Sequence, residues 1–208
     1  MNKKMMIALG IAAASFSTLT ATDFSANVAI TSDYVWRGVS QTDSNPAIQG
    51  GFDLEHESGF SLGTWGSNVA GSANAEFDIY GAYAMDLEGI NFSVGFIVYT
   101  YSDDSSLDFE EGNIGASYGP FSAMISHDFD NDNTYIEAAY DYEITDSILL
   151  SAHMGEYSFD NDGDYTDWSI SASTEYNGFG FSLAYIDTDI SNFDAADSRI
   201  AFSISKSL

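Results

Sequence analysis

The sequence predicts an all-β fold, an antiparallel up-and-down transmembrane β-barrel of about twelve strands. Three observations indicate this fold class. Apolar and polar residues alternate with a period of two along most of the chain. Short turns alternate with longer polar loops. The acidic residues that can be placed on strands all take the polar phase.

The first 21 residues are predicted to be a secretory signal peptide, so the barrel is assigned to residues 22–208. Lys3 and Lys4 precede an apolar run and then small polar residues, with cleavage expected near Ala21. The apolar run is too short to span a bilayer as a helix, and no later stretch reaches the required ~20 apolar residues. We therefore expect an exported protein of the cell outer membrane.

The composition is strongly acidic, with 32 acidic against five basic residues and a formal net charge of −27. Outside the leader the basic residues are Arg37, Arg199 and Lys206. Such a chain would repel nucleic acid, whose binding needs basic patches, and would attract cations. An equal alternative to cation binding is that the acidic residues only keep the protein soluble in a salty environment. The absence of cysteine excludes a disulfide scaffold and a cysteine metal site, and no cofactor is expected.

Residues 24–58 predict the first hairpin. The apolar phase of its first strand runs through Phe24, Ala26, Val28, Ile30, Tyr34 and Trp36. The opposite phase is polar and carries Asp33 and Arg37. After a polar turn, Ile48, Phe52 and Leu54 alternate with Gln49, Asp53 and Glu55.

The same alternation predicts further strands at 60–64, 75–85, 90–98, 107–118, 121–127, 136–142, 148–154, 168–174, 179–185 and 200–208. In 107–118 the phase changes between Phe109 and Ile114, which predicts a bulge at Glu111–Gly112. Without the strands near 60–64 and 107–118 the barrel has ten strands, and this alternative stays open.

The connections differ in length at the two ends of the strands. Short turns are expected at 57–59, 86–89, 119–120, 143–147 and 177–178, and Asn177–Gly178 is a strong two-residue hairpin signal. The connections between them are mostly longer, as at 102–106, 159–164 and 187–197. This segregation favours an outer-membrane barrel with both termini in the periplasm over a β-sandwich.

The strand carboxylates take the polar phase, and Gly and Ser are frequent beside them, as a narrow polar lumen requires. The residues expected to line the pore are Asp33, Arg37, Asp53, Glu55, Glu76, Asp78, Glu137, Asp141, Glu175 and Arg199. Aromatic residues near strand ends are expected to form the interfacial girdle: Tyr34, Trp36, Tyr99, Tyr142, Trp168 and Tyr185.

The segment from Val28 to Val69 carries SDYVWRGVSQT, NPAIQGGFD and GFSLGTWGSNV. It resembles the amino-terminal signature of the TorF family of porin-like proteins, also catalogued as a Gram-negative conserved hypothetical family. The resemblance implies an outer-membrane location and a porin role, and it identifies no solute. The chain departs from the usual aromatic end of outer-membrane barrels, because its last residue is Leu208.

Arg37 and Arg199 are expected to meet at the outer mouth, since the first and last strands are neighbours in a closed barrel. With Asp33 and Asp53 they form either a constriction that sets a transverse field or a structural ion pair at the closure seam. The sequence leaves both interpretations open.

Two acidic loops are weak candidates for divalent cations, with carboxylates two residues apart: Asp128, Asp130, Asp132, Asp160, Asp162 and Asp164. Neither completes an EF-hand, because position six lacks Gly and position twelve lacks Glu. A solvated acidic loop is the other interpretation.

Enzyme motifs are weak, and we expect no enzyme. Residues 115–119 (GASYG) match a nucleophile elbow formally, but that motif needs a strand followed by a helix. His56, His127 and His153 could serve an outer-membrane hydrolase. His127 adjoins Ser126, yet neighbours on a strand point to opposite faces.

These observations predict a porin-like channel for passive diffusion of small hydrophilic solutes, with a preference for cations. Expected partners are outer-membrane lipid, lipopolysaccharide, and small solutes or cations; the oligomeric state stays open. The alternatives are a closed, non-conducting barrel with a structural or surface-binding role, and the outer-membrane hydrolase.

Overall fold

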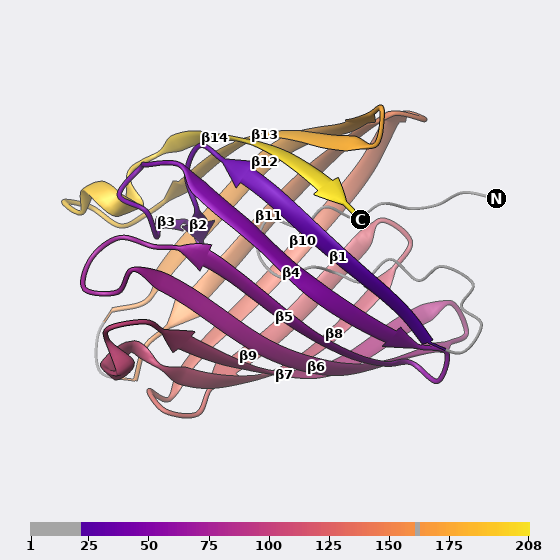
Figure 1. Cartoon of the computed structure of the whole chain (residues 1–208), viewed down its shortest axis with the longest axis horizontal. Coiled ribbons are helices and arrows are strands. Elements are labelled where there is room, and N and C mark those ends of the chain that lie inside the picture. Colours follow the sequence, from indigo (N-terminus) through magenta and orange to yellow (C-terminus); the bar gives the residue numbers. More distant parts are fainter. Residues whose placement is uncertain (1–21, 161–162) are drawn as a thin grey trace.

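The computed structural model describes residues 22–160 and 163–208, and the predicted signal peptide lies outside this range. The described residues form a closed barrel of twelve antiparallel strands (Figure 1). The barrel strands are β1 (Thr22–Thr31), β4 (Ala47–His56), β5 (Phe60–Asn68), β6 (Ala75–Leu87), β7 (Ile90–Tyr101), β8 (Phe109–Tyr118), β9 (Phe121–Asp128), β10 (Asn133–Thr145), β11 (Ile148–Ser158), β12 (Tyr165–Tyr176), β13 (Phe179–Thr188) and β14 (Arg199–Ser207). The twelve-stranded prediction is confirmed, and the ten-stranded alternative is wrong.

Each strand pairs with its sequence neighbour, and β1 closes the barrel by pairing with β14, with Asn27 opposite Ser207 and Thr31 opposite Ser203. The short turns lie at one end of the barrel and the longer connections at the other (Figure 1). Two short 3₁₀ helices, η1 (Ser105–Leu107) and η2 (Asp194–Ala196), lie in long connections. The predicted turn at Asn177–Gly178 is confirmed: both residues have positive φ, as a type I′ hairpin requires.

In the described ranges, no helix is both long and apolar enough to cross a membrane.

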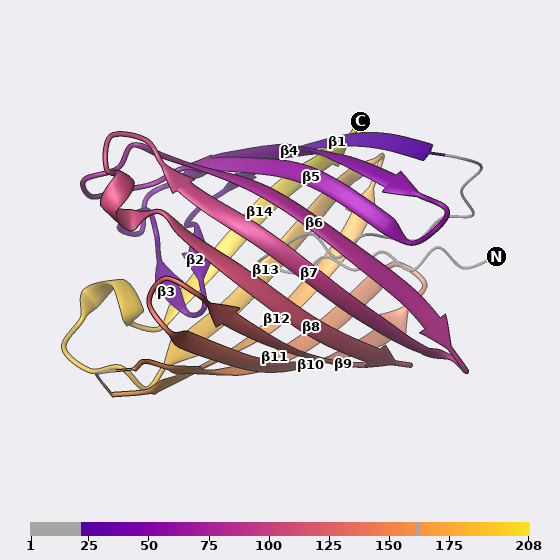
Figure 2. The ribbon, with the colours of Figure 1, turned by 90° about the horizontal axis from the view of Figure 1, so that it is seen from below.

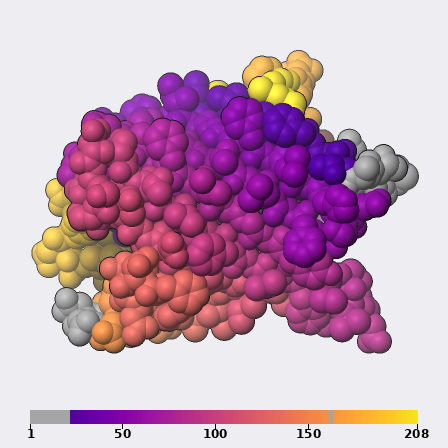
Figure 3. All heavy atoms as spheres, turned by 60° about the horizontal axis from the view of Figure 1, so that its bottom comes forward, coloured from indigo at the N-terminus to yellow at the C-terminus, as the bar shows by residue number. Residues whose placement is uncertain are grey.

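The outer wall is apolar around the barrel. Large apolar side chains in the outward phase are widely exposed, including Ile48 at 66%, Phe77 at 57% and Ile114 at 60%. Figure 3 shows one face of the molecule, formed largely by residues of the amino-terminal half of the chain. Soluble monomers rarely expose contiguous apolar patches above a few hundred Å². The wall is therefore stable only against an apolar medium.

Two sequence predictions about the strands are wrong. The β8 ladder has no bulge at Glu111–Gly112, because Glu111 pairs with Ile97 and Gly112 with Phe96 in continuous register. The apparent phase change arises because Phe109 points inward, where its ring stacks on Tyr99 at 4.2 Å between centroids. A register shift does occur between β10 and β11, at Glu143–Thr145.

The first strand is shorter than predicted and ends at Thr31 instead of continuing through Trp36. Residues 32–46, named here the inserted segment, turn into the barrel and form a small hairpin of β2 (Val35–Trp36) and β3 (Val39–Ser40). Figure 2 shows this hairpin inside the barrel, near the end with the longer connections. Tyr34 and Trp36 therefore do not belong to an interfacial girdle. Tyr99 is also internal, with 2% exposure.

Candidate functional site in the barrel lumen

The inserted segment crosses the lumen. It leaves the wall between β1 and β4 and reaches side chains of β8, β10, β11 and β12, which lie on the opposite side in the barrel order. Arg37 and Gly38 form its tip, with φ of 46° and 81°. Two successive residues with positive φ close a tight two-residue turn, and this geometry favours glycine at Gly38.

Arg37 fixes the tip to the far wall. Its Nη2 donates to both carboxylate oxygens of Glu111 at 2.8 Å, and the two side chains are 6% and 1% exposed. The guanidinium lies 4.3 Å from the ring centroids of Trp36 and Tyr135 and 4.8 Å from that of Tyr157. The Tyr165 phenol donates to the Arg37 carbonyl at 2.9 Å. An ion pair and cation–π contacts thus hold the tip.

The environment of Arg37 keeps it charged. Burial alone would lower the pKa of the Arg37 guanidinium, but the adjacent Glu111 carboxylate outweighs that effect and leaves the pKa above its ordinary value. Nη1 has no hydrogen-bond partner within the described residues. Because removing one partner of a buried ion pair leaves an uncompensated charge, Arg37 and Glu111 depend on each other.

Arg199 fixes the base of the same segment. Its Nη1 donates to Asp33 at 2.7 Å, and Ser40 and Thr42 donate to the other oxygen of Asp33 at 2.6 and 2.9 Å. Tyr34 donates to Glu76 on β6 at 3.2 Å. The segment is therefore attached to the wall at both its base and its tip.

The prediction that Arg37 lies late in the first strand, beside Arg199 at the mouth, is wrong. The arginines belong to separate ion pairs, Arg37 with Glu111 and Arg199 with Asp33. Asp53 joins neither pair. It accepts from Tyr80 at 2.5 Å and from Asn27 at 3.4 Å, on the part of β4 nearer the short turns.

The remaining predicted lumen carboxylates fall into two groups. Glu76 and Asp78 are buried at the level of the inserted segment, with 1% and 6% exposure. The others lie closer to the short turns and are less buried: Asp53, Glu55, Glu137 and Asp141 are half-buried and Glu175 is exposed. Glu137 pairs with His153 at 2.9 Å.

Asp128, in the first of the two acidic loops, shapes a turn. It is 2% exposed and accepts from the backbone of Asp130 and Asn131 and from the Asn131 side chain. Asp130 accepts from the Glu110 amide at 2.8 Å, and Asp132 lies 3.5 Å from His127 on the outer face. No group of three or more His, Cys, Asp or Glu side chains that could hold a metal ion occurs within residues 22–160 and 163–208.

In the second acidic loop, Asp164 accepts from the Phe159 amide at 3.4 Å. Asp162 lies outside the described residues, and Asp160 makes a contact of its own.

The motifs considered for catalysis lie apart. GASYG occupies the end of β8 and the turn into β9, which is another strand. Ser126 is buried whereas His127 faces outward, so they take opposite faces as expected. His56 bonds to Ser58 at the exposed end of β4.

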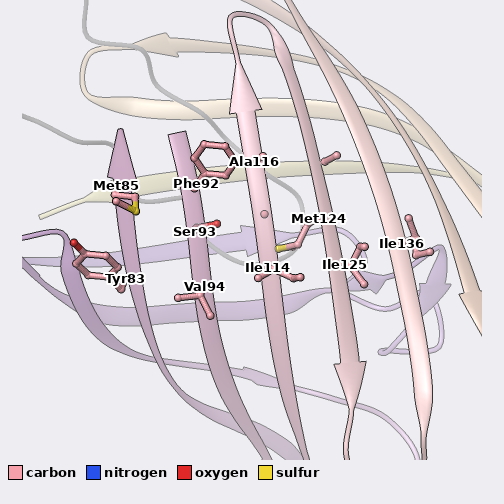
Figure 4. A pocket seen from close by; sticks show the side chains of 12 residues that line it. Tyr83, Met85, Phe92, Ser93, Val94, Ile114, Ala116, Met124, Ile125 and Ile136 are labelled. Carbon is pink, nitrogen blue, oxygen red and sulfur yellow. The ribbon is translucent and has the colours of Figure 1, made fainter. Parts of the chain in front are cut away.

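A shallow apolar groove lies on the outer wall across β6 to β10. Its lining includes Tyr83, Phe92, Val94, Ile114, Ala116 and Ile125 (Figure 4). Ala116 and Ala123 are paired across β8 and β9. Because their side chains are small, the surface is depressed between the larger side chains around them. The groove is apolar and belongs to the outer wall.

A family model described as a bacterial protein of unknown function, Gcw_chp, matches residues 15–207. The chain belongs to this family. No curated protein matches the sequence. The match to Gcw_chp confirms neither the resemblance to the TorF family nor the porin role that the resemblance implies.

The Gcw_chp barrel has the fold of solved porins. It matches a KdgM porin with a TM-score of 0.67 and 8% identity, over 88% of this chain and 99% of that chain. A NanC porin matches with a TM-score of 0.61 and 10% identity, over 88% and 98%. A KdgM porin in complex with disordered oligogalacturonate matches with a TM-score of 0.64 and 9% identity, over 90% and 99%. At such identities the likeness establishes the fold alone.

Sequence reasoning missed Glu111, the ion-pair partner of Arg37. The signal was present, because Phe109, Glu111 and Asn113 share one phase of β8 and take the inward face. Because Phe109 was assumed to face outward, a bulge was predicted after it, and Glu111 was not recognised as an inward-facing residue.

Proposed function

We propose that this Gcw_chp protein is an outer-membrane channel for passive diffusion of small hydrophilic solutes, with a preference for cations. The observation that carries the proposal is the pairing of an apolar outer wall with an interior of carboxylates, serines and glycines in one closed barrel. In an outer membrane the apolar wall faces lipid, and the polar interior offers hydrated solutes a path. The longer connections then face the exterior, where lipopolysaccharide is the neighbour.

Charge supports the choice of cations. The interior carries the half-buried carboxylates Asp53, Glu55, Glu137 and Asp141, and both interior arginines are already paired with carboxylates. The oligogalacturonate of the KdgM complex is a polyanion. A carboxylate-lined interior would repel it, so we do not extend that ligand to this chain.

The inserted segment makes the pore narrow. Side chains at its level are almost fully buried, among them Tyr99, Glu111, Tyr135 and Tyr157. This burial also favours the second candidate, a closed barrel with a structural or surface-binding role. A conducting pore at this level must be small, so we expect a single-channel conductance well below that of an open barrel of the same strand number.

Planar bilayer recordings of refolded protein test both candidates. Discrete small steps, with a reversal potential under a KCl gradient that indicates K⁺ preference, support the cation channel. Preference for chloride would contradict the selectivity. A protein that inserts as a folded barrel but carries no current would establish the closed barrel instead. An esterase assay in detergent, expected to be negative, tests the hydrolase reading.

A further inference from the structure

Two buried carboxylates on β6 have no compensating charge. Glu76 and Asp78 are two residues apart and point into the lumen, with 1% and 6% exposure. All five ion pairs found in the described parts of the chain involve other acidic residues. This contrasts with Asp33 and Glu111, which are equally buried and are each paired with an arginine.

Oxygen atoms at this place lack hydrogen-bond partners. Within the described residues, Glu76 Oε2, Asp78 Oδ1 and the Tyr99 phenol are buried without one. Tyr99 lies directly opposite Asp78 in the β6–β7 ladder, so both side chains point to the same internal face. The Tyr99 phenol, in a side chain only 2% exposed, is a third unsatisfied oxygen on this internal face.

The inserted segment closes this place from one side. Tyr34 donates to Glu76 Oε1, and its ring packs edge-on against Trp65 at 5.3 Å between centroids. Trp65 in turn lies opposite Asp78 in the β5–β6 ladder. The carboxylates are thus enclosed between β5, β6, β7 and Tyr34.

An ionised carboxylate buried without a partner costs several kcal/mol, and two side by side also repel each other. A hard divalent cation removes both costs at once, because it neutralises two negative charges and prefers oxygen ligands. Ca²⁺ fits better than Mg²⁺, since it accepts irregular arrangements of oxygens from a rigid strand whereas Mg²⁺ demands near-octahedral geometry.

We propose that Glu76 and Asp78, together with the phenol of Tyr99, bind one Ca²⁺ ion beneath the inserted segment, with water completing its coordination. With only two carboxylates the affinity is modest, with a Kd of roughly 0.1–1 mM, in the range of weak extracellular sites. The site is separate from both acidic loops.

The test is Ca²⁺ competition against Tb³⁺ luminescence in refolded protein in detergent at 100 mM NaCl. Tyr34, Trp65 and Tyr99 lie at the site and can transfer energy to bound Tb³⁺. We expect one saturable site that Ca²⁺ displaces better than Mg²⁺. The double variant Glu76→Gln/Asp78→Asn should lose it, and Tyr99→Phe should weaken binding by about tenfold, as loss of a supporting group at a metal site does.

The matched control is Asp141→Asn/Glu143→Gln, which removes two carboxylates with the same spacing from β10, nearer the short turns. It should keep the site. Equal loss in both double variants, or no saturable binding by the wild-type protein, would overturn the proposal. If the β6 double variant does not refold, the single variants Glu76→Gln, Asp78→Asn and Tyr99→Phe decide on the same criterion.

The site does not require that the barrel conduct. Recordings on the same preparation separate the two proposals: current without Ca²⁺ binding removes the site and leaves the channel, whereas Ca²⁺ binding without current leaves the site in a closed barrel.

Discussion

Arg37 contacts the far wall through charge and aromatic rings at once, and Glu111 is its only ion-pair partner in the described residues. In the sequence, Arg37 is one of very few basic residues and shares the polar phase of the predicted first strand with Asp33. This pattern predicted that Arg37 lies at the outer mouth of the barrel. What places it is the turn at Arg37–Gly38, inside the lumen near the end with the longer connections (Figure 2). Strand periodicity carries no information on a connection that folds inward.

Replacing Arg37 with Met should destabilise the barrel by about 3–5 kcal/mol, because Glu111 is then buried without a partner, and Glu111→Gln alone should also destabilise it by leaving Arg37 unpaired. The double variant Arg37→Met/Glu111→Gln should recover much of that loss, since no charge is left unpaired. Denaturant midpoints are measured in detergent from the difference in gel mobility between the folded and the unfolded barrel. The double-mutant cycle built from them gives the interaction energy of Arg37 and Glu111. Equal losses in the single and double variants would mean that the ion pair is not what stabilises the tip.

Gly38→Ala should displace the tip of the inserted segment. A Cβ there would lie 2.5 Å from Thr188 Cγ2 and 2.6 Å from Asp167 Cβ, in addition to the strain of φ +81°. Gly71→Ala is the matched control, because Gly71 has φ +89° and open space around its Cβ position. Both variants carry left-handed strain of about 1–2 kcal/mol. Only Gly38→Ala should also change the single-channel conductance, and an equal change in Gly71→Ala would argue against a role for the tip.

At the scale of the element, the barrel strands were predictable and the inserted segment was not. Alternation with a period of two repeats along the barrel strands, because an Arg or Lys on the lipid-facing side costs about 2–4 kcal/mol at mid-depth. Residues 32–36 continue the alternation although they are not part of the barrel wall. The first strand was therefore predicted to be five residues longer than it is. Gly38 and Pro46 mark the segment as a connection, but not its direction.

Removing the inserted segment should widen the pore. Thr31 and Ala47 are directly paired across β1 and β4, so Asn-Gly in place of residues 32–46 can close the hairpin. We expect conductance to rise severalfold in planar bilayers because nothing then crosses the lumen. Asn-Gly in place of residues 129–132, between the paired Asp128 and Asn133, is the control and should leave it unchanged. An unaltered conductance after removal of residues 32–46 would show that another part of the chain limits the pore.

At the scale of the whole molecule, the barrel separates its charges from its apolar surface. Fold class and strand number follow from the sequence because two-residue periodicity and segregated loop lengths are properties of the entire chain. The identity of interior pairs does not follow, since residues such as Arg37 and Glu111 are 74 positions apart. The alternation pattern shows which side chains point inward. It does not show whether an inward side chain is paired, enclosed or open to the lumen.

The half-buried interior carboxylates should set the ion selectivity of the proposed channel. Neutralising Asp53, Glu55, Glu137 and Asp141 as Asn or Gln should move the reversal potential under a KCl gradient towards zero, because fixed charge inside a narrow pore is poorly screened. Neutralising the exposed Asp43, Glu57, Glu88 and Asp146 removes the same charge from the outside. At 0.1 M salt the Debye length is ~10 Å, so these outer charges should have little influence. A larger shift in the outer variant would place the selectivity at the barrel ends rather than in the lumen.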